Sequence, residues 1–170
     1  MKTFSKSPVN KQNGEIKMKL KIHGTIRQST VDGLGIRYAI FCQGCPHHCK
    51  GCHNPETWNF QNGFYVDTDD LLKEIQKDPL LDGVTFSGGE PFLQEKPLSD
   101  LADKIHQLGL NVWCYTGFTY EQIKDSELIK HIDVLVDGPY IQELRTLTGF
   151  RGSSNQRVIK LFPMSPKTQT

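Results

Sequence analysis

The chain has 170 residues, and its 20 Lys plus Arg against 19 Asp plus Glu give a formal net charge of +1. A balance this close to neutral argues against nucleic-acid binding, which needs a basic excess, and 36% hydrophobic residues fit a folded domain rather than a disordered chain. No apolar run approaches the roughly 18 residues that span a bilayer, and the polar N-terminus has no apolar signal-peptide core. We therefore expect a cytoplasmic protein with neither a membrane nor a nucleic acid as partner.

Both ends of the chain are polar and irregular in sequence. We expect a flexible leader over residues 1–17, a single domain over residues 18–162 and a flexible tail over residues 163–170. An added N-terminal strand is the alternative for the leader.

Between these ends, strand-like and helix-like segments alternate. The expected strands are residues 36–41, 83–86, 111–115, 133–137 and 158–161, and the expected helices are residues 68–77, 98–108 and 120–130. Thr68 is the expected N-cap of the first helix, and Gly109 is the expected C-terminal cap of the second. Strands that alternate with helices predict right-handed βαβ units and a mostly parallel sheet, in which ligands bind beyond the C-terminal ends of the strands.

Four of the five cysteines lie within eleven residues, after the expected strand 36–41; the full set is Cys42, Cys45, Cys49, Cys52 and Cys114. An odd total without a secretion signal does not favour a disulfide framework, so we expect thiolates held for ligation. Cys114 lies inside an apolar strand and is expected to be a small buried hydrophobe.

Cys45, Cys49 and Cys52 have the spacing C-x3-C-x2-C, which can bind three of the four irons of a [4Fe–4S] cluster. The fourth iron then has no cysteine and is open to the amine and carboxylate of a small molecule. Two alternatives remain. Zinc would need a fourth ligand such as Cys42 or one of the neighbouring histidines, and an electron-transfer cluster would use Cys42 as its fourth ligand. We assign no role to His47 or His48.

A second motif, Ser87-Gly88-Gly89-Glu90-Pro91, follows the expected strand 83–86. The two motifs in this order resemble the radical S-adenosylmethionine (SAM) superfamily. Five further stretches resemble the activating proteins of anaerobic, class III ribonucleotide reductase: residues 30–37, 52–58, 115–118, 137–140 and 150–157. The resemblance extends from about residue 21 to residue 161.

The resemblance implies an α/β fold, a partial (βα) barrel of the radical SAM type whose mostly parallel sheet is open on one side. It implies an oxidoreductase with two cofactors, a [4Fe–4S] cluster bound by Cys45, Cys49 and Cys52, and SAM. An electron from the reduced cluster would cleave SAM, and the radical formed would remove the Cα hydrogen of a glycine in the large subunit of the reductase. A low-potential electron donor such as flavodoxin is implied as a further partner.

Roles for other residues follow from the same resemblance. Gly88 and Gly89 would let the backbone approach the cofactor, and this segment, with Ser87 and Glu90, would bind its methionyl ammonium group. The backbone of residues 51–53, comprising Gly51, Cys52 and His53, would lie against the adenine, with His53 either stacked on the ring or facing solvent.

Two further groups lie near later strands. Asp137 would bind ribose hydroxyls or the sulfonium region, or else it is a cap or turn residue beside Gly138. Ser154, Asn155 and Arg157 form a polar group in which Arg157 could hold the cofactor carboxylate; a structural turn and a docking surface for the partner are the alternatives.

Three functional hypotheses remain open. The first is activation of the anaerobic reductase. The second is activation of another glycyl radical enzyme, such as pyruvate formate-lyase, or a small-molecule reaction of the deazapurine-forming kind. The third is a non-catalytic iron–sulfur or zinc module.

Overall fold

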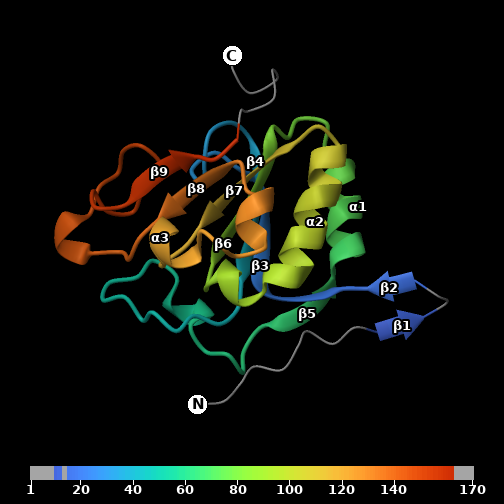
Figure 1. Cartoon of the computed structure of the whole chain (residues 1–170), viewed down its shortest axis with the longest axis horizontal. Helices are drawn as coiled ribbons and strands as arrows, with labels where there is room; N and C mark the ends of the chain where they lie inside the picture. Colours follow the sequence, from blue (N-terminus) through green and yellow to red (C-terminus); the bar gives the residue numbers. More distant parts are fainter. Residues whose placement is uncertain (1–9, 13–14, 163–170) are drawn as a thin grey trace.

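The computed structural model describes residues 10–12 and 15–162. Seven strands form one open sheet in the order β5-β3-β4-β6-β7-β8-β9, and β1 and β2 form a separate hairpin (Figure 1). The strands are β1 (Asn10–Gln12), β2 (Glu15–Lys17), β3 (Lys19–Ser29), β4 (Arg37–Cys42), β5 (Phe64–Asp67), β6 (Gly83–Gly88), β7 (Asn111–Tyr115), β8 (Val134–Asp137) and β9 (Arg157–Lys160).

The centre of the sheet is parallel. Strands β4, β6, β7 and β8 pair in parallel, whereas β3 is antiparallel to both β4 and β5, and β9 is antiparallel to β8. β5 consequently runs in the same direction as the four central strands, so the expected mostly parallel α/β sheet is confirmed.

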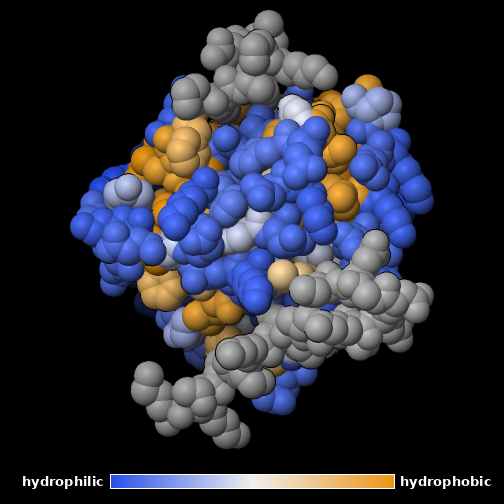
Figure 2. All heavy atoms as spheres, turned by 45° about the vertical axis from the view of Figure 1, so that its right-hand side comes forward, coloured by the Kyte–Doolittle hydropathy of each residue, from blue (hydrophilic) through white to orange (hydrophobic). Residues whose placement is uncertain are grey.

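Helices α1 and α2 lie on one face of this sheet. The helices are α1 (Thr68–Gln76), α2 (Glu95–Gln107) and α3 (Tyr120–Ile123), and the short 3-10 helices are η1 (Pro55–Thr57), η2 (Pro91–Leu93), η3 (Leu128–His131) and η4 (Gln142–Leu144). Apolar residues at helical spacing on α2 are buried in the main core. In Figure 2, hydrophilic residues dominate the visible surface and the apolar ones form small separate groups.

The opposite face of the sheet carries a smaller core. Side chains alternate along β7, so Val112 and Cys114 join the helix-covered core while Trp113 joins Val134 and Val136 on the other face. Arg37 on β4 is fully buried beside Trp113, with its guanidinium 5.4 Å from the ring centroid.

The buried Arg37 has a partner for each guanidinium nitrogen. Nε donates to Thr85 Oγ1 at 2.6 Å, Nη1 donates to the Leu34 carbonyl at 2.9 Å, and Nη2 donates to Asn111 Oδ1 at 2.8 Å and to the Val84 carbonyl at 2.8 Å. Burial lowers the pKa of Arg37 to about 10. These bonds join β4, β6 and β7 across the sheet.

Two sequence-based predictions about helices are wrong. Asp67, not Thr68, is the N-cap of α1, and its carboxylate accepts a hydrogen bond from Asp69 N at 3.0 Å. The expected helix over residues 120–130 ends at Ile123 and is followed by η3. Ser126 separates the two, because its hydroxyl accepts from Ile129 N at 3.4 Å and so competes with a continuous helix.

The remaining expectations concern one strand, one helix cap and the two ends of the chain. The strand 111–115 and the cap at Gly109, whose φ is +77°, are confirmed. The strands β3 and β5 and the hairpin β1–β2 were not expected; the hairpin lies within the expected leader, and the alternative of added N-terminal strand structure is what the structure has for residues 10–12 and 15–17. The rest of the expected leader up to residue 14, and the expected tail, lie outside the described residues. None of the helices in the described ranges has the length and apolar content of a membrane span.

Candidate active site

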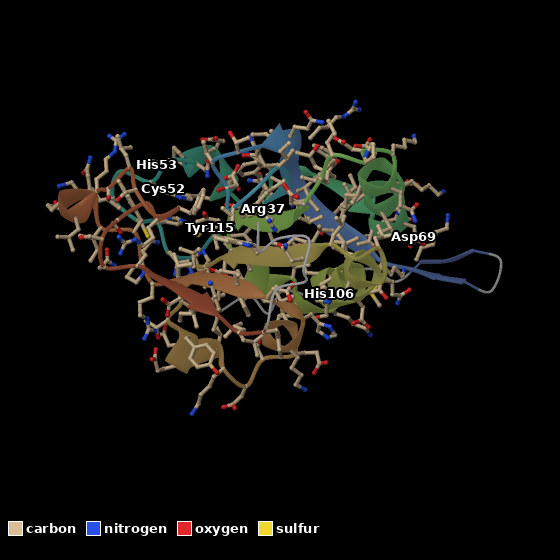
Figure 3. The ribbon with its side chains drawn as sticks, turned by 90° about the horizontal axis from the view of Figure 1, so that it is seen from above. Arg37, Cys52, His53, Asp69, His106 and Tyr115 are labelled. Atoms are coloured by element: carbon tan, nitrogen blue, oxygen red, sulfur yellow. The ribbon has the colours of Figure 1, made fainter. Side chains whose placement is uncertain are left out.

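A cavity of about 670 Å³ lies at the C-terminal ends of β4, β6 and β7. Its wall includes Cys45, Cys49 and Cys52 from the loop after β4, and the Ser87–Gly89 segment that ends β6. The turn after β7 and the segment from Tyr140 to Gln156 form further parts of the wall. Figure 3 shows Cys52 and His53 at the end of the molecule opposite Asp69 of α1. The cysteine loop and the Ser87–Gly89 segment therefore meet at the C-terminal ends of the central strands, where the sequence predicted a ligand site.

Backbone hydrogen bonds fix the start of the cysteine loop. Gly44 adopts φ +103° and donates to the Thr57 carbonyl at 2.7 Å, and Cys45 N donates to the Trp58 carbonyl at 3.2 Å. Glu90 N in turn donates to the Gly44 carbonyl at 2.8 Å. The loop is thus fastened both to the segment that follows it and to the end of β6.

The thiols of this loop differ in their surroundings. Cys45 is buried, and burial raises the pKa of its thiol to about 11. Cys49 and Cys52 are half-buried, and Asn54 N lies 3.4 Å from Cys52 Sγ as a donor. A buried thiolate is costly without a neighbouring cation. We therefore expect these thiols to lose their protons when iron binds.

The donor set fits a cluster better than a single ion. In the part of the chain that the structure describes, no three His, Cys, Asp or Glu side chains converge on one metal position. A cubane spreads its ligands over three irons, so its thiolates need not converge in this way. Cys42 is fully buried and does not line the cavity, so three cysteines and not four face it.

The glycines of Ser87–Pro91 are required for a reason that the sequence did not reveal. A Cβ on Gly88 would lie 2.7 Å from Cβ of Phe41, and one on Gly89 would lie 2.5 Å from the Gly44 carbonyl oxygen. We expected the missing side chains to let the cofactor approach. Both residues do line the cavity, but the space left by each missing Cβ is filled by β4 and the cysteine loop.

Glu90 of the same motif has no exposed surface. One carboxylate oxygen accepts from Phe92 N at 3.0 Å and from Thr116 Oγ1 at 2.8 Å; the other accepts from Gly117 N at 3.0 Å and lies 2.7 Å from His47 Nε2. Glu90 is not part of the cavity wall. Its carboxylate joins three segments beneath the site.

A web of side-chain to backbone hydrogen bonds fastens the segment from Gly138 to Gln156. Gln156 Nε2 donates to the Gly138 carbonyl at 3.0 Å, and its Oε1 accepts from Gly152 N at 2.9 Å and Ser153 N at 3.1 Å. Asn155 Nδ2 donates to the Pro139 carbonyl at 2.8 Å. The web holds Tyr140 and Phe150, among others, against the cavity.

One hydrogen bond and one ring contact connect this segment to its surroundings. Tyr115 donates through its hydroxyl to the Phe150 carbonyl at 2.6 Å. The His53 ring lies 5.1 Å from the ring of Tyr140, tilted by 52°. His53 therefore forms part of the cavity wall between the cysteine loop and the 138–156 segment.

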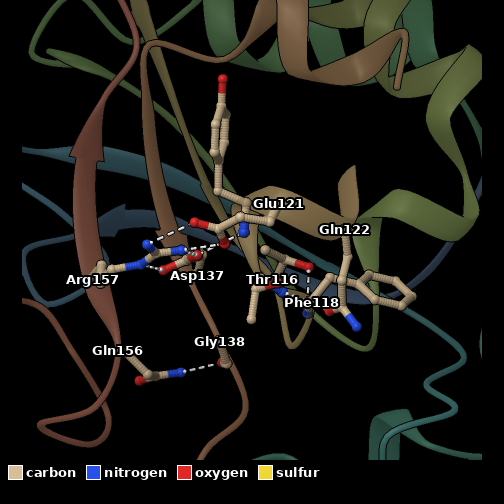
Figure 4. A network of polar contacts seen from close by, with 10 residues as sticks. Thr116, Phe118, Glu121, Gln122, Asp137, Gly138, Gln156 and Arg157 are labelled. Carbon is tan, nitrogen blue, oxygen red and sulfur yellow. Dashed lines mark hydrogen bonds and ion pairs between the residues drawn. The ribbon is translucent and has the colours of Figure 1, made fainter. Parts of the chain in front are cut away.

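Asp137 and Arg157 pair with each other at the edge of the sheet (Figure 4). Arg157 Nε donates to Asp137 Oδ1 at 3.0 Å and Nη2 donates to Asp137 Oδ2, while Nη1 and Nη2 donate to the Glu121 carboxylate at 3.0 and 2.8 Å. Asp137 Oδ2 also accepts from Tyr120 N at 2.7 Å. The Arg157 hydrogen bonds lower the pKa of Glu121 to about 2.

The structure thus divides the predicted site residues into two groups. The cavity wall contains Cys45, Cys49, Cys52, His53, Ser87, Gly88 and Gly89. The wall does not contain Gly51, Glu90, Asp137, Ser154, Asn155 or Arg157.

Sequence reasoning missed several residues that contribute to the site. Thr116 and Gly117 follow an expected strand, and Gln156 lies in the 150–157 stretch. Their place at a strand end or in a matching stretch is the sequence feature that could have identified them. Asp32 lines the cavity from the loop before β4. His47 had no signal beyond its place between two cysteines.

Comparisons with known proteins agree with this geometry. A family model described as a 4Fe-4S single cluster domain matches residues 31–159. The anaerobic ribonucleoside-triphosphate reductase-activating protein of Enterobacteria phage T4 is 37% identical over 134 residues, which cover 75% of this chain and 86% of that protein. The protein of the same name from Vibrio cholerae is 35% identical over 146 residues, covering 79% and 93%.

Two further matches cover a smaller share of the matched protein. The pyruvate formate-lyase-activating enzyme of Clostridium pasteurianum is 38% identical over 130 residues, which cover 72% of this chain and 54% of that enzyme. The crystal structure of QueE from Escherichia coli superimposes with a TM-score of 0.52 at 21% identity, covering 59% of this chain and 53% of QueE. The likeness to QueE shows the fold alone.

The three-cysteine loop, the Ser-Gly-Gly-Glu-Pro strand end and these matches define an oxidoreductase of the radical SAM class. Its cofactors are a [4Fe–4S] cluster and SAM, as the sequence predicted. Within that class, the chain belongs to the family of anaerobic ribonucleoside-triphosphate reductase-activating proteins.

Proposed function

We propose that this chain generates the glycyl radical on the large subunit of anaerobic ribonucleotide reductase. The observation that carries the proposal is that three cysteines and the end of β6 line one cavity. When bound, the cluster and SAM supply the one-electron cleavage that ends in removal of a glycine Cα hydrogen. Cys45, Cys49 and Cys52 would bind three irons and leave the fourth open to the cofactor.

The remaining roles are proposals about placement. The backbone of Ser87–Gly89 would bind the methionyl ammonium, and residues 51–53 would lie against the adenine. Support comes from the position of His53 in the cavity wall beside Tyr140. A cofactor contact by Glu90 also remains a proposal. Its carboxylate oxygens already accept protein hydrogen bonds, so it would have to exchange one of them to contact the cofactor.

The predicted contacts of Asp137 and Arg157 also remain proposals. For Arg157 to bind the cofactor carboxylate, its guanidinium would have to exchange a hydrogen bond that it now makes to Asp137 or Glu121. Ser154 and Asn155 would bind the cofactor or the partner. The Asn155 side chain already donates to the Pro139 carbonyl within its own segment. This favours a role in holding the segment rather than in contacting the cofactor.

We further propose that the open seven-stranded sheet is the partial (βα) barrel of this class, formed by residues 18–162, and that its uncovered side admits the glycine-bearing segment of the reductase. A low-potential protein such as flavodoxin would reduce the cluster. Free thiols held for ligation suit a reducing compartment, so we place the protein in the cytoplasm.

A second candidate is activation of pyruvate formate-lyase. It is supported by the 38% identity to the Clostridium pasteurianum enzyme, although this chain covers only 54% of that enzyme. The match extends over 86% and 93% of the reductase activators, which favours the first candidate.

One experiment separates the candidates. Anaerobically reconstituted protein would be incubated with SAM, a reductant and either the large reductase subunit or pyruvate formate-lyase, and the glycyl radical would be recorded by electron spin resonance. We expect a doublet with the reductase subunit only. Cys45→Ala, Cys49→Ala and Cys52→Ala should each abolish it, whereas Cys114→Ala, a buried thiol outside the cavity, should not. A doublet with pyruvate formate-lyase alone would overturn the proposal.

A further inference from the structure

His47 lies between the two cysteines Cys45 and Cys49 and lines the cavity, and its Nε2 makes a polar contact beneath it. Its Nε2 lies 2.7 Å from Glu90 Oε2, and the imidazole is only 18% exposed. Both oxygens of the Glu90 carboxylate accept backbone N–H groups, from Phe92 and Gly117, so in this pair the carboxylate is the acceptor and Nε2 is the donor.

The surroundings of His47 fit the ring closely. A Cβ on Gly117 would lie 2.5 Å from His47 Cδ2, so the ring packs directly on the backbone of the turn after β7. The Phe118 ring meets the imidazole edge-on, with centroids 4.6 Å apart. The neighbouring His48 stacks instead on Trp58, with centroids 4.7 Å apart and planes 7° apart.

Glu90 is the other half of the link. Its carboxylate is buried and also accepts from Thr116 Oγ1 and Gly117 N. The carboxylate is therefore held by β7 on one side and by His47 on the other. Through it, the Cys45–Cys49 arm of the loop is bonded to the ends of both β6 and β7.

We propose that His47 is a positioning residue, which holds the Cys45–Cys49 arm in register with Ser-Gly-Gly-Glu-Pro through its Nε2–Glu90 hydrogen bond. This inference rests on the proposed function, since the arm it positions carries two of the three iron ligands. The backbone bond from Glu90 N to the Gly44 carbonyl fixes only the start of the arm. His47 fixes its middle, and so sets the position of the Cys45 and Cys49 thiols relative to the end of β6.

The test uses two amides of different reach. The amide nitrogen of Gln at position 47 falls near the position of Nε2, whereas that of Asn falls near Nδ1 and does not reach Glu90. Both variants lack the ring, so a difference between them reports the hydrogen bond. His48→Asn is the matched control, because His48 has φ +49° and Asn tolerates that conformation.

For each protein we would measure iron per chain after anaerobic reconstitution, the SAM dissociation constant by equilibrium dialysis, and the change in the spectrum of the reduced cluster on adding SAM. We expect His47→Asn to weaken SAM binding about tenfold and to lose most of the spectral change. His47→Gln should lie within about threefold of wild type, and His48→Asn should match wild type.

Each outcome has a distinct meaning. Equal behaviour of the Gln and Asn variants, whether both intact or both impaired, would overturn the link through Nε2. Wild-type protein that binds no cluster or no SAM would instead contradict the proposed function. Thermal unfolding of the cluster-free variants shows whether each one folds: a cooperative transition in both supports a misplaced arm, whereas loss of the transition in either would refute a purely positioning role.

Discussion

Gly89→Ala should dislodge the cysteine loop from the end of β6. The new Cβ would lie 2.5 Å from the Gly44 carbonyl oxygen and 2.8 Å from that of Cys42. Both are backbone atoms, so no side-chain rotation relieves the contact. Overpacking of this kind costs about 1–3 kcal/mol, and a weakened Glu90 N to Gly44 hydrogen bond adds about 1 kcal/mol. We therefore expect a loss of about 2–4 kcal/mol in the free energy of unfolding.

The assay is urea unfolding of the cluster-free protein, paired with iron content after anaerobic reconstitution. Gly24→Ala is the steric control, because a Cβ there meets no atom within 4 Å, and we expect it to change stability by no more than about 1 kcal/mol. Gly109→Ala measures left-handed strain without a collision, since its φ is +77° and its surroundings are open. A Gly89→Ala protein with wild-type stability and a full iron complement would refute the reasoning.

Three further predictions concern the buried residues Cys42 and Arg37 and the pH dependence of the His106–Asp133 pair. Cys42→Ala should keep four irons per chain, because Cys42 lies outside the cavity wall, and should cost about 1 kcal/mol in urea unfolding; loss of the cluster would make Cys42 a ligand. Arg37→Lys should cost more than about 2 kcal/mol in the same assay, since an ammonium cannot satisfy the partners of a buried guanidinium fork, and Arg145→Lys on the surface should cost nothing measurable. The hydrogen bond to Asp133 raises the pKa of His106, so this pair stabilises the fold fully below the unfolded pKa of about 6.5 and less as pH rises through the folded value. The stability difference between wild type and His106→Gln should therefore shrink as pH rises from about 6, and a difference that grows with pH would contradict this.

The parallel centre of the fold could be predicted because its strands are short, apolar and separated by helical periodicity. Residues 111–115 are a strand in both sequence and structure, since they are buried on both faces and read as a continuous apolar run. The strands β3 and β5 could not be predicted in the same way, because they lie toward the edge of the sheet and are not continuous apolar runs. β3 carries charged residues and a glycine, and its pairing with β4 shifts register twice, which breaks the alternation a strand would otherwise show.

The candidate site was predictable where its residues lie close together in the sequence. The cysteine spacing identified three residues of one cavity wall. It could not identify His47 or Gln156, because their roles depend on carboxylate and backbone partners brought close only by the sheet. The sequence predicted Gly88 and Gly89 as site residues but for a different reason, since it does not show which neighbour occupies the space of a missing Cβ.

The order in which the site is built along the chain has a consequence for its assembly. The three cysteines that we propose as iron ligands lie within residues 45–52, Glu90 follows them, and the last residue of the cavity wall, Gln156, lies near the end of the described chain. During synthesis the ligand loop therefore leaves the ribosome well before the last wall exists. We therefore expect a nascent chain stalled before Gln156 to present its thiols to a cluster donor before the cavity that would hold SAM is complete.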